Sequence, residues 1–302
     1  MQEKNTIPNS TSFVLASKVK DYFQLIKFTL SFMVVFSTVI CYLLAPNVRF
    51  DLVQVLLLFT AGMLVTGSAN SINQLFEKNT DAMMKRTSSR PVASGRMSVT
   101  EAAVFAGITG LLGTAMMWYF FNFQSAMVSL FSLFLYGFIY TPLKTVNSVA
   151  VLVGAVPGAL PCLIGWVAAT DDFSTGGWIL FGIQFLWQFP HFWAIAWVAH
   201  TDYSKAGFKL LPSQKGPTKF TAMQSVMYSV LMIPVGILPY YYGISGYTSM
   251  WIVLACNVVM VLLCVRLLLK MDVGSARKVM FGSYFYLMIV FLSLYADKIR
   301  VD

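Results

Sequence analysis

The sequence has very little charge. Only 11% of its 302 residues are charged, and 58% are hydrophobic, whereas a soluble protein typically carries about 25% charged residues. This scarcity excludes an ordinary soluble domain and indicates a polytopic membrane protein. The four cysteines form no C-x-x-C pair, so the sequence indicates neither a disulfide framework nor a zinc site.

The beginning of the chain also lacks the pattern of a signal peptide, in which an early apolar stretch is followed by a cleavage site. Residues 1–25 are therefore expected to be a cytoplasmic N-terminal tail and not a signal peptide. Residues 26–302 are expected to form a single transmembrane domain with two long cytoplasmic loops, at about 74–100 and about 200–220.

Long hydrophobic runs are abundant. Runs of about 20 apolar residues mark membrane-spanning helices, and they predict an all-α bundle of about nine spans. The predicted spans are 26–46, 52–73, 101–121, 124–141, 148–169, 177–199, 221–243, 248–269 and 278–296.

The basic residues are distributed unevenly over the predicted loops. Nine spans with a cytoplasmic N-terminus leave only Arg49, Lys298 and Arg300 of the 21 basic residues outside. The positive-inside rule therefore predicts a cytoplasmic N-terminus and an external C-terminus in a bacterial-type cytoplasmic membrane. The net charge of +9 is then an orientation signal, which argues against nucleic acid as a partner.

Three polar residues follow one another at a spacing of four near the end of the second span, as Asn73-x-x-x-Glu77-x-x-x-Asp81. Residues four apart lie on the same face of a helix. Two carboxylates beside an amide are hard-oxygen ligands, which suit Mg²⁺. The alternative is a solvated helix end, but solvation alone requires no common face.

Cations follow this motif directly, at Lys85, Arg86 and Arg90. They could serve only to orient the chain in the membrane. Arg86 and Arg90 lie four apart, however, and could clamp two phosphoryl groups. Acids beside bases at a membrane surface suggest Mg²⁺–diphosphate chemistry on a lipid-soluble substrate.

Further candidates lie in and beside other spans. His191 and Trp187 fall inside the sixth span, and an intramembrane histidine is rarely without function. Asp202 and Tyr203 follow in the loop at about 200–220, and Asp202 could add a third metal carboxylate if the two long loops face each other. Tyr140 and Lys144 end the fourth span on the cytoplasmic side, as diphosphate contacts or orientation signals.

These residues resemble the motifs of the UbiA-type intramembrane prenyltransferases, and among them the branch that farnesylates haem. The glutamate at the middle acidic position and the His-Phe-Trp segment resemble that branch in particular. The similar stretches are Asn73-x-x-x-Glu77-x-x-x-Asp81-x-x-Met84-x-Arg86-Thr87-x-x-Arg90-Pro91, Tyr140-Thr141, Gly154-Ala155-x-Pro157-Gly158-Ala159-x-Pro161, Trp187-Gln188-x-Pro190-His191-Phe192-Trp193 and Asp202-Tyr203-x-x-Ala206-Gly207.

The resemblance implies transfer of a farnesyl group from farnesyl diphosphate to a vinyl group of haem B, which gives haem O. It implies Mg²⁺ as cofactor, held by Glu77, Asp81 and Asp202, with Asn73 as a further ligand or as a residue that positions Glu77.

The same resemblance assigns the remaining candidates to the substrates. His191 would contact haem, as an iron ligand or by orienting it. The implied partners are farnesyl diphosphate, haem B, membrane lipids and a downstream haem-modifying enzyme or terminal oxidase. The implied diphosphate and substrate contacts are Lys85, Arg86, Arg90, Tyr140, Lys144, Trp187 and Tyr203.

Two other functions fit part of the pattern. One is a prenyltransferase for an aromatic quinone precursor, against which the deep His191 argues. The other is a carrier of a lipid pyrophosphate or haem that performs no chemistry. A carrier with alternating access needs a site near the middle of the membrane, whereas the acids and bases here cluster on one side.

Overall fold

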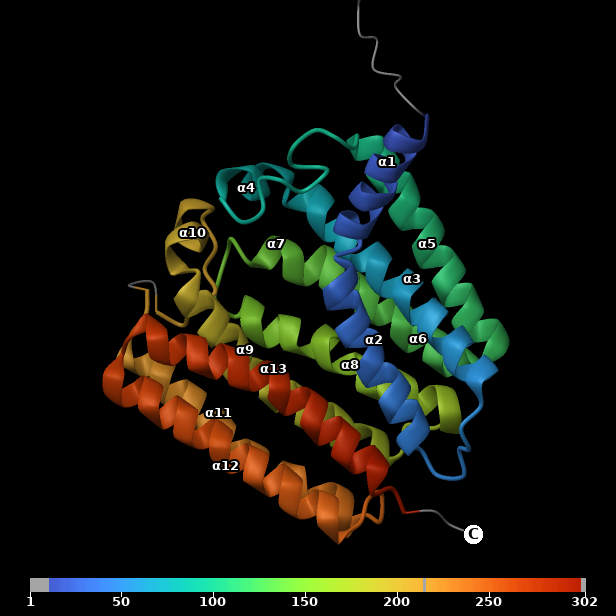
Figure 1. Cartoon of the computed structure of the whole chain (residues 1–302), viewed down its shortest axis with the longest axis vertical. Coiled ribbons are helices and arrows are strands. Elements are labelled where there is room, and N and C mark those ends of the chain that lie inside the picture. The colour runs from blue at the N-terminus through green and yellow to red at the C-terminus, as the bar shows by residue number, and fades with distance from the viewer. Residues whose placement is uncertain (1–10, 214–215, 300–302) are drawn as a thin grey trace, which may run out of the picture.

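The computed structural model describes residues 11–213 and 216–299 as an all-α bundle, as the sequence predicts (Figure 1). Within these ranges the only β pairing is an isolated bridge between Ser245 and Lys298. The helices are α1 (Thr11–Leu25), α2 (Phe28–Leu44), α3 (Leu52–Phe76), α4 (Lys78–Met83), α5 (Val99–Phe120), α6 (Phe123–Phe134), the π-helix η1 (Leu135–Tyr140), α7 (Thr141–Leu143), α8 (Ala150–Thr170), α9 (Thr175–Val198), α10 (His200–Lys205), α11 (Lys219–Tyr241), α12 (Tyr247–Lys270) and α13 (Val273–Ala296).

The number of spans agrees with the prediction. Eight described helices are long and apolar enough to cross a membrane, and α1 with α2 forms a ninth candidate that is bent by 50°. The helices α6, η1 and α7 run together as one span, Phe123–Leu143. The α3 helix continues to Phe76, three residues beyond the predicted end, and so carries the first polar residue of the acidic motif. The chain is a multi-pass membrane protein.

The segment predicted as an N-terminal tail is helical from Thr11 to Leu25, and its first ten residues lie outside the described ranges. This helix, α1, packs on the start of α5. Lys18 Nζ lies 2.9 Å from Glu101 Oε1, and the rings of Tyr22 and Phe105 are 4.9 Å apart.

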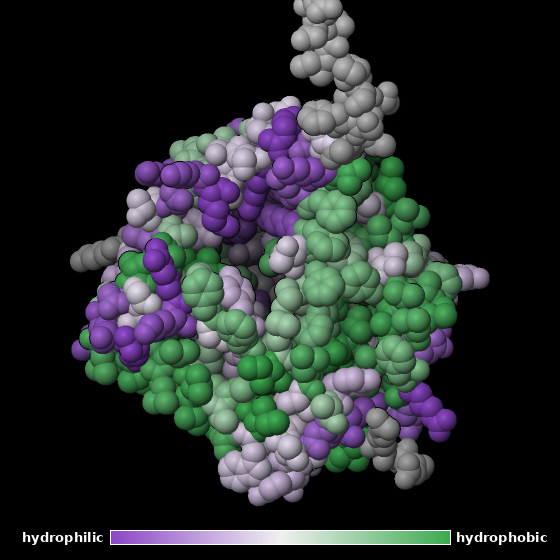
Figure 2. Space-filling model, in the orientation of Figure 1, coloured by the Kyte–Doolittle hydropathy of each residue, from purple (hydrophilic) through white to green (hydrophobic). Residues whose placement is uncertain are grey.

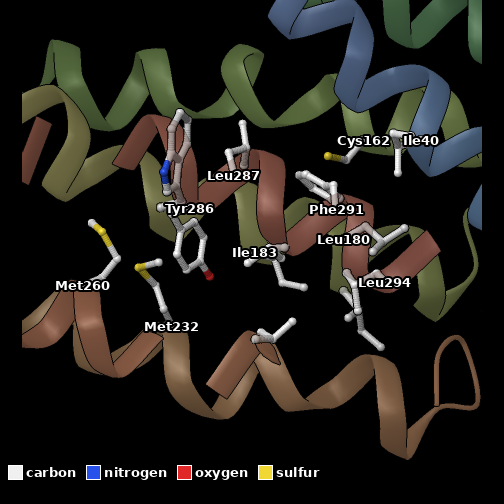
Figure 3. Close-up of a cluster of buried hydrophobic side chains, with 14 of the residues drawn as sticks. Ile40, Cys162, Leu180, Ile183, Met232, Met260, Tyr286, Leu287, Phe291 and Leu294 are labelled. Atoms are coloured by element: carbon white, nitrogen blue, oxygen red, sulfur yellow. The ribbon is translucent and has the colours of Figure 1, made fainter. Parts of the chain in front are cut away.

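The largest buried cluster joins α9 to α11, α12 and α13 (Figure 3). Apolar burial alone does not drive helix association in lipid, so packing and polar contacts between helices hold the bundle. Asn257 on α12 shows this, because its Nδ2 donates to the Met232 carbonyl at 3.0 Å and its Oδ1 accepts from the Tyr286 hydroxyl at 2.7 Å.

The α2 and α8 helices cross at Gly165. A Cβ atom at this position would overlap the Thr38 carbonyl of α2. We expect Gly165→Leu to lower the free energy of unfolding by about 1–3 kcal/mol, because the added side chain must push the two backbones apart. Gly107→Leu on α5 is the matched control, since a Cβ there meets no atom within 4 Å. Thermal unfolding in detergent measures both, and equal midpoints would contradict the close crossing.

The bundle has two distinct ends. The α1, α4 and α10 helices lie at the same end, and the C-terminal end of the chain lies at the opposite one (Figure 1). The segments that carry the predicted site residues therefore gather at one end of the spans.

Candidate functional site

The acidic motif lies where α3 ends and α4 begins. The helix is interrupted at Glu77, whose backbone angles are φ −90° and ψ 9°. The i-to-i+4 hydrogen bonds nevertheless continue, since Glu77 N donates to Asn73 O at 3.0 Å and Asp81 N to Glu77 O at 2.7 Å. The predicted spacing is thus kept across a break, and all three side chains are buried.

Basic side chains hold both carboxylates. Arg90 Nη1 lies 2.8 and 2.7 Å from the two carboxylate oxygens of Asp81, and 3.9 Å from Glu77 Oε2. Lys144 Nζ donates to Glu77 Oε1 at 2.8 Å. The loop after α4 folds back to place Arg90, because the Thr87 hydroxyl donates to the Asp81 carbonyl at 2.9 Å.

The lysines near Glu77 favour its ionised form. Burial opposes the charged form of Glu77, but the nearby ammonium groups of Lys144 and Lys27 outweigh it and lower the pKa of that carboxyl. Burial likewise opposes the charged form of Lys144. The electrostatic influence of Tyr140 and Glu77 outweighs it and raises the pKa of this lysine. Glu77 and Lys144 are therefore both charged, and they form an ion pair with each other.

Lys27 also lies at the site, although no sequence motif predicts it there. Its Nζ lies 2.6 Å from Asn73 Oδ1, and the residue lines the same cavity as the acids. The positive-inside rule accounts for Lys27 only as one of the cytoplasmic charges that orient the chain. Its position inside the predicted span 26–46 was the signal, since a charge within a span is costly unless it is used.

The second loop contributes an aromatic residue to the cavity. Tyr203 lines it, and the Tyr203 hydroxyl lies 3.2 Å from Arg86 Nη2. Asp202, one residue earlier on α10, does not line it, and the described residues contain no cluster of three His, Cys, Asp or Glu side chains that could hold a metal. The expected set of Glu77, Asp81 and Asp202 is therefore not assembled in this structure. Lys85 is exposed and also lies off the cavity.

His191, on α9, also lines this cavity. The Ser283 hydroxyl donates to the Met280 carbonyl at 2.6 Å and lies 2.7 Å from His191 Nδ1. A hydroxyl has one hydrogen, so Ser283 must accept from His191 Nδ1–H. The Nε2 atom then carries the free lone pair, and no described residue hydrogen-bonds to it.

Trp187 contacts both this histidine and Ser283. Its ring stacks on His191 at 4.5 Å between centroids, and its Nε1 donates to the Ser283 carbonyl at 2.8 Å. Trp187 does not line the cavity in this structure; its described contacts are with the His191 ring and the Ser283 carbonyl.

One cavity of about 1000 Å³ joins these groups. Figure 2 shows a hollow bordered by hydrophilic surface toward α1 and α4, with apolar surface below. Of the twelve expected site residues, Asn73, Lys85, Trp187 and Asp202 are absent from its lining. The other eight, Glu77, Asp81, Arg86, Arg90, Tyr140, Lys144, His191 and Tyr203, all line it.

Comparison with known proteins identifies the family. Residues 34–292 match the UbiA prenyltransferase family. The chain is 44% identical to protoheme IX farnesyltransferase of Cytophaga hutchinsonii over 285 residues, which cover 94% of this chain and all of the relative. It is 40% identical to the protein of the same name from Christiangramia forsetii, over 94% of this chain and 95% of the relative.

Solved structures share the fold. A structure described for digeranylgeranylglyceryl phosphate synthase has a TM-score of 0.77 at 22% identity, and it covers 94% of this chain and 100% of its own. A UbiA homologue from Archaeoglobus fulgidus, bound to GPP and Mg²⁺, has a TM-score of 0.67 at 16% identity and covers 91% and 99%. Sequence and fold agree, and the chain belongs to the UbiA prenyltransferase family.

Proposed function

We propose that this protein transfers a farnesyl group from farnesyl diphosphate to a vinyl group of haem B and so makes haem O. One observation carries the proposal, namely that a single cavity is lined both by paired acids and bases and by a histidine whose Nε2 has no hydrogen-bond partner among the described residues. The relatives named protoheme IX farnesyltransferase support the same substrates.

The acidic donor set fits Mg²⁺, the cofactor that we propose. Glu77 and Asp81 supply carboxylate oxygens and Asn73 an amide oxygen, within two helical turns of one another, and Mg²⁺ prefers such hard ligands. Bound metal would neutralise negative charge on the diphosphate. Asp202 does not line the cavity in this structure and would have to move to join this set.

The bases act on the leaving group. Arg90 and Lys144 are paired with the two carboxylates in this structure. If Glu77 and Asp81 held metal, these two cations would be available to phosphoryl oxygens. Arg86 lines the same cavity and can add a planar, bidentate contact. Together they stabilise the negative charge that grows as the bond between carbon and the diphosphate oxygen breaks.

An apolar space suits the prenyl chain. A second, smaller cavity of about 90 Å³ lies between α2, α3, α6 and α8, and Leu30 lines both it and the large cavity. Val34, Leu133 and Ile164 are among its other lining residues. The farnesyl tail can therefore lie along Leu30 while its diphosphate stays among the cations.

His191 is proposed to ligate the haem iron. Metal-ligating histidines almost always donate their other ring N–H to a fixed acceptor, and Ser283 is that acceptor here. The vinyl carbon of the bound haem would then attack C1 of the farnesyl group. Water adds to the resulting cation, and a proton leaves, so haem B, farnesyl diphosphate and water give haem O and pyrophosphate.

Haem binding gives a test of His191 that does not need turnover. We expect His191→Ala to weaken haem B binding by more than about tenfold and to alter the Soret band, because the iron loses its ligand. The control is His200→Ala, since His200 does not line the large cavity. Titration of the purified protein with haem measures both. An unchanged Soret band in His191→Ala would show that His191 is not an iron ligand.

The orientation follows from the same assignment. With the diphosphate site facing the cytoplasm, α1 lies on the cytoplasmic side and the C-terminus on the outside of a bacterial-type cytoplasmic membrane. Haem O would pass to a downstream haem-modifying enzyme or a terminal oxidase, and the surrounding lipids deliver the substrates.

Turnover tests the whole proposal. The membrane-embedded protein is incubated with haem B, farnesyl diphosphate and Mg²⁺, with and without a chelator, and haem pigments are read by mass spectrometry. We expect haem O only when metal is present. Prenylation of a supplied aromatic acid instead, with haem B intact, would place the chain among the quinone-pathway enzymes. No product from a folded protein would favour the carrier.

A further inference from the structure

The break between α1 and α2 has no local cause in the sequence. The two helix axes meet at 50°, and the bend lies between Leu25 and Phe28 without glycine or proline. Lys27 adopts φ 49° and ψ 57°, the left-handed region, which is unfavourable for a residue with a Cβ. Such a conformation persists only where the surroundings hold it in place.

Side chains of α3 provide that hold. Gln74 Nε2 donates to the Gln24 and Leu25 carbonyls at 2.8 and 3.0 Å. Asn70 Nδ2 donates to the Ile26 carbonyl at 3.2 Å. These carbonyls lose helical partners at the break, and such groups are costly at a membrane unless they are bonded. The break is thus held in place by specific hydrogen bonds from α3.

The break brings Lys27 to the site. Its Nζ lies 2.6 Å from Asn73 Oδ1. Two hydrogen bonds fix the orientation of the Asn73 amide. Its Nδ2 donates to Thr141 Oγ1 at 3.1 Å, and that hydroxyl donates to the Tyr136 carbonyl at 2.8 Å. The amide oxygen therefore faces the ammonium group on the cavity wall.

This ammonium group has no acidic partner among the described residues. Glu77 is paired with Lys144 and Asp81 with Arg90, and the described contacts use one of the three N–H donors of Lys27. An amino group that lines a cavity beside two cations, and is held by a neutral amide, leaves N–H donors for an anion.

We propose that Lys27 binds the diphosphate of the prenyl donor, and that Asn73 holds its ammonium group in place until the donor and its metal arrive. The identity of the anion rests on the proposed function. If Asn73 served as a metal ligand, its oxygen would no longer hold Lys27, and the amino group would be available to a phosphoryl oxygen of the donor.

Haem propionates are the other source of anionic oxygen. The position of Lys27 favours diphosphate, because Asn73, Glu77 and Asp81 form the proposed metal wall and Lys27 touches the first of them. Haem is assigned to His191, which lies on α9 and not beside Asn73 in the described contacts.

The test compares Lys27→Met, which keeps most of the aliphatic length, with Lys27→Arg, which keeps the charge. The matched control is Lys78→Met, because Lys78 is exposed next to Glu77 and does not line the cavity. Binding of inorganic pyrophosphate with Mg²⁺ is measured on the full protein in nanodiscs, together with haem binding, the KM for farnesyl diphosphate and kcat.

We expect Lys27→Met to weaken pyrophosphate binding and raise that KM by about 10- to 100-fold, the loss of one charge-assisted hydrogen bond. Haem binding should stay unchanged, and Lys27→Arg should recover part of the affinity. Unaltered pyrophosphate affinity would overturn the proposal, as would a loss confined to haem binding or shared equally by both ligands. Pyrophosphate binding needs no turnover, so the result stands apart from any failure to make haem O.

Discussion

Replacement of Glu77 by glutamine is expected to lower kcat for farnesyl transfer by about 10²- to 10³-fold. Glutamine keeps the size of the side chain but removes the charge that both Lys144 and metal require. Lys144 Nζ, now 2.8 Å from Glu77 Oε1, would lose its buried counter-ion. Initial rates of haem O formation over a range of Mg²⁺ concentrations measure the effect, and excess metal should not restore the rate.

Glu101→Gln provides the control for this substitution. Glu101 is also paired with a lysine, Lys18, at 2.9 Å, but it lies on α5 outside the cavity lining. A partly exposed pair of this kind contributes little to stability, so the control should turn over normally. Near-normal turnover in Glu77→Gln would remove Glu77 from the site.

Arg90→Ala should have a comparable effect on kcat, about 10²- to 10³-fold, and a second effect on stability. Arg90 contacts both oxygens of the buried Asp81 carboxylate, and breaking a buried pair costs about 3–5 kcal/mol. Mg²⁺ can replace the lost guanidinium at Asp81. The unfolding midpoint of the variant should therefore rise with Mg²⁺ more than that of the unsubstituted protein, as thermal unfolding would show.

Arg277→Ala is the control, because it removes the same side chain from an exposed position on α13 outside the cavity lining. It should change neither kcat nor the response of the unfolding midpoint to Mg²⁺. If Arg90→Ala turned over normally, the guanidinium would serve the fold alone. If Mg²⁺ failed to stabilise it, Asp81 would not be a metal ligand.

The sequence predicted the spans and the acidic wall because both depend on local periodicity. Runs of apolar residues mark spans wherever they pack, and the spacing of Asn73, Glu77 and Asp81 survives even though the helix breaks at Glu77. The break itself was not predicted. The i-to-i+4 hydrogen bonds continue through it, so it leaves no change in the spacing of the motif.

Contacts between distant segments were beyond such reasoning. The position of Lys27 depends on Asn70 and Gln74, which lie more than forty residues away and bind the carbonyls of the α1–α2 break. A lysine at the start of an apolar run otherwise looks like an orientation charge.

Neighbouring residues in the loops were equally hard to tell apart. Arg86 lines the cavity whereas Lys85 does not, and Tyr203 lines it whereas Asp202 does not. Successive residues of a helix point about 100° apart, so the direction of α10 decides which side chain faces inward. Motif spacing alone carries no information on that direction.

Pyrophosphate must leave before a second farnesyl diphosphate can bind, and the ion pairs of the resting site favour its departure. Arg90 and Lys144 have carboxylate partners within 2.8 Å in this structure. Asp81 and Glu77 would therefore compete with pyrophosphate for the same cations. Re-formation of these pairs offsets the cost of losing the product anion, so the site can bind a highly charged leaving group tightly and still release it.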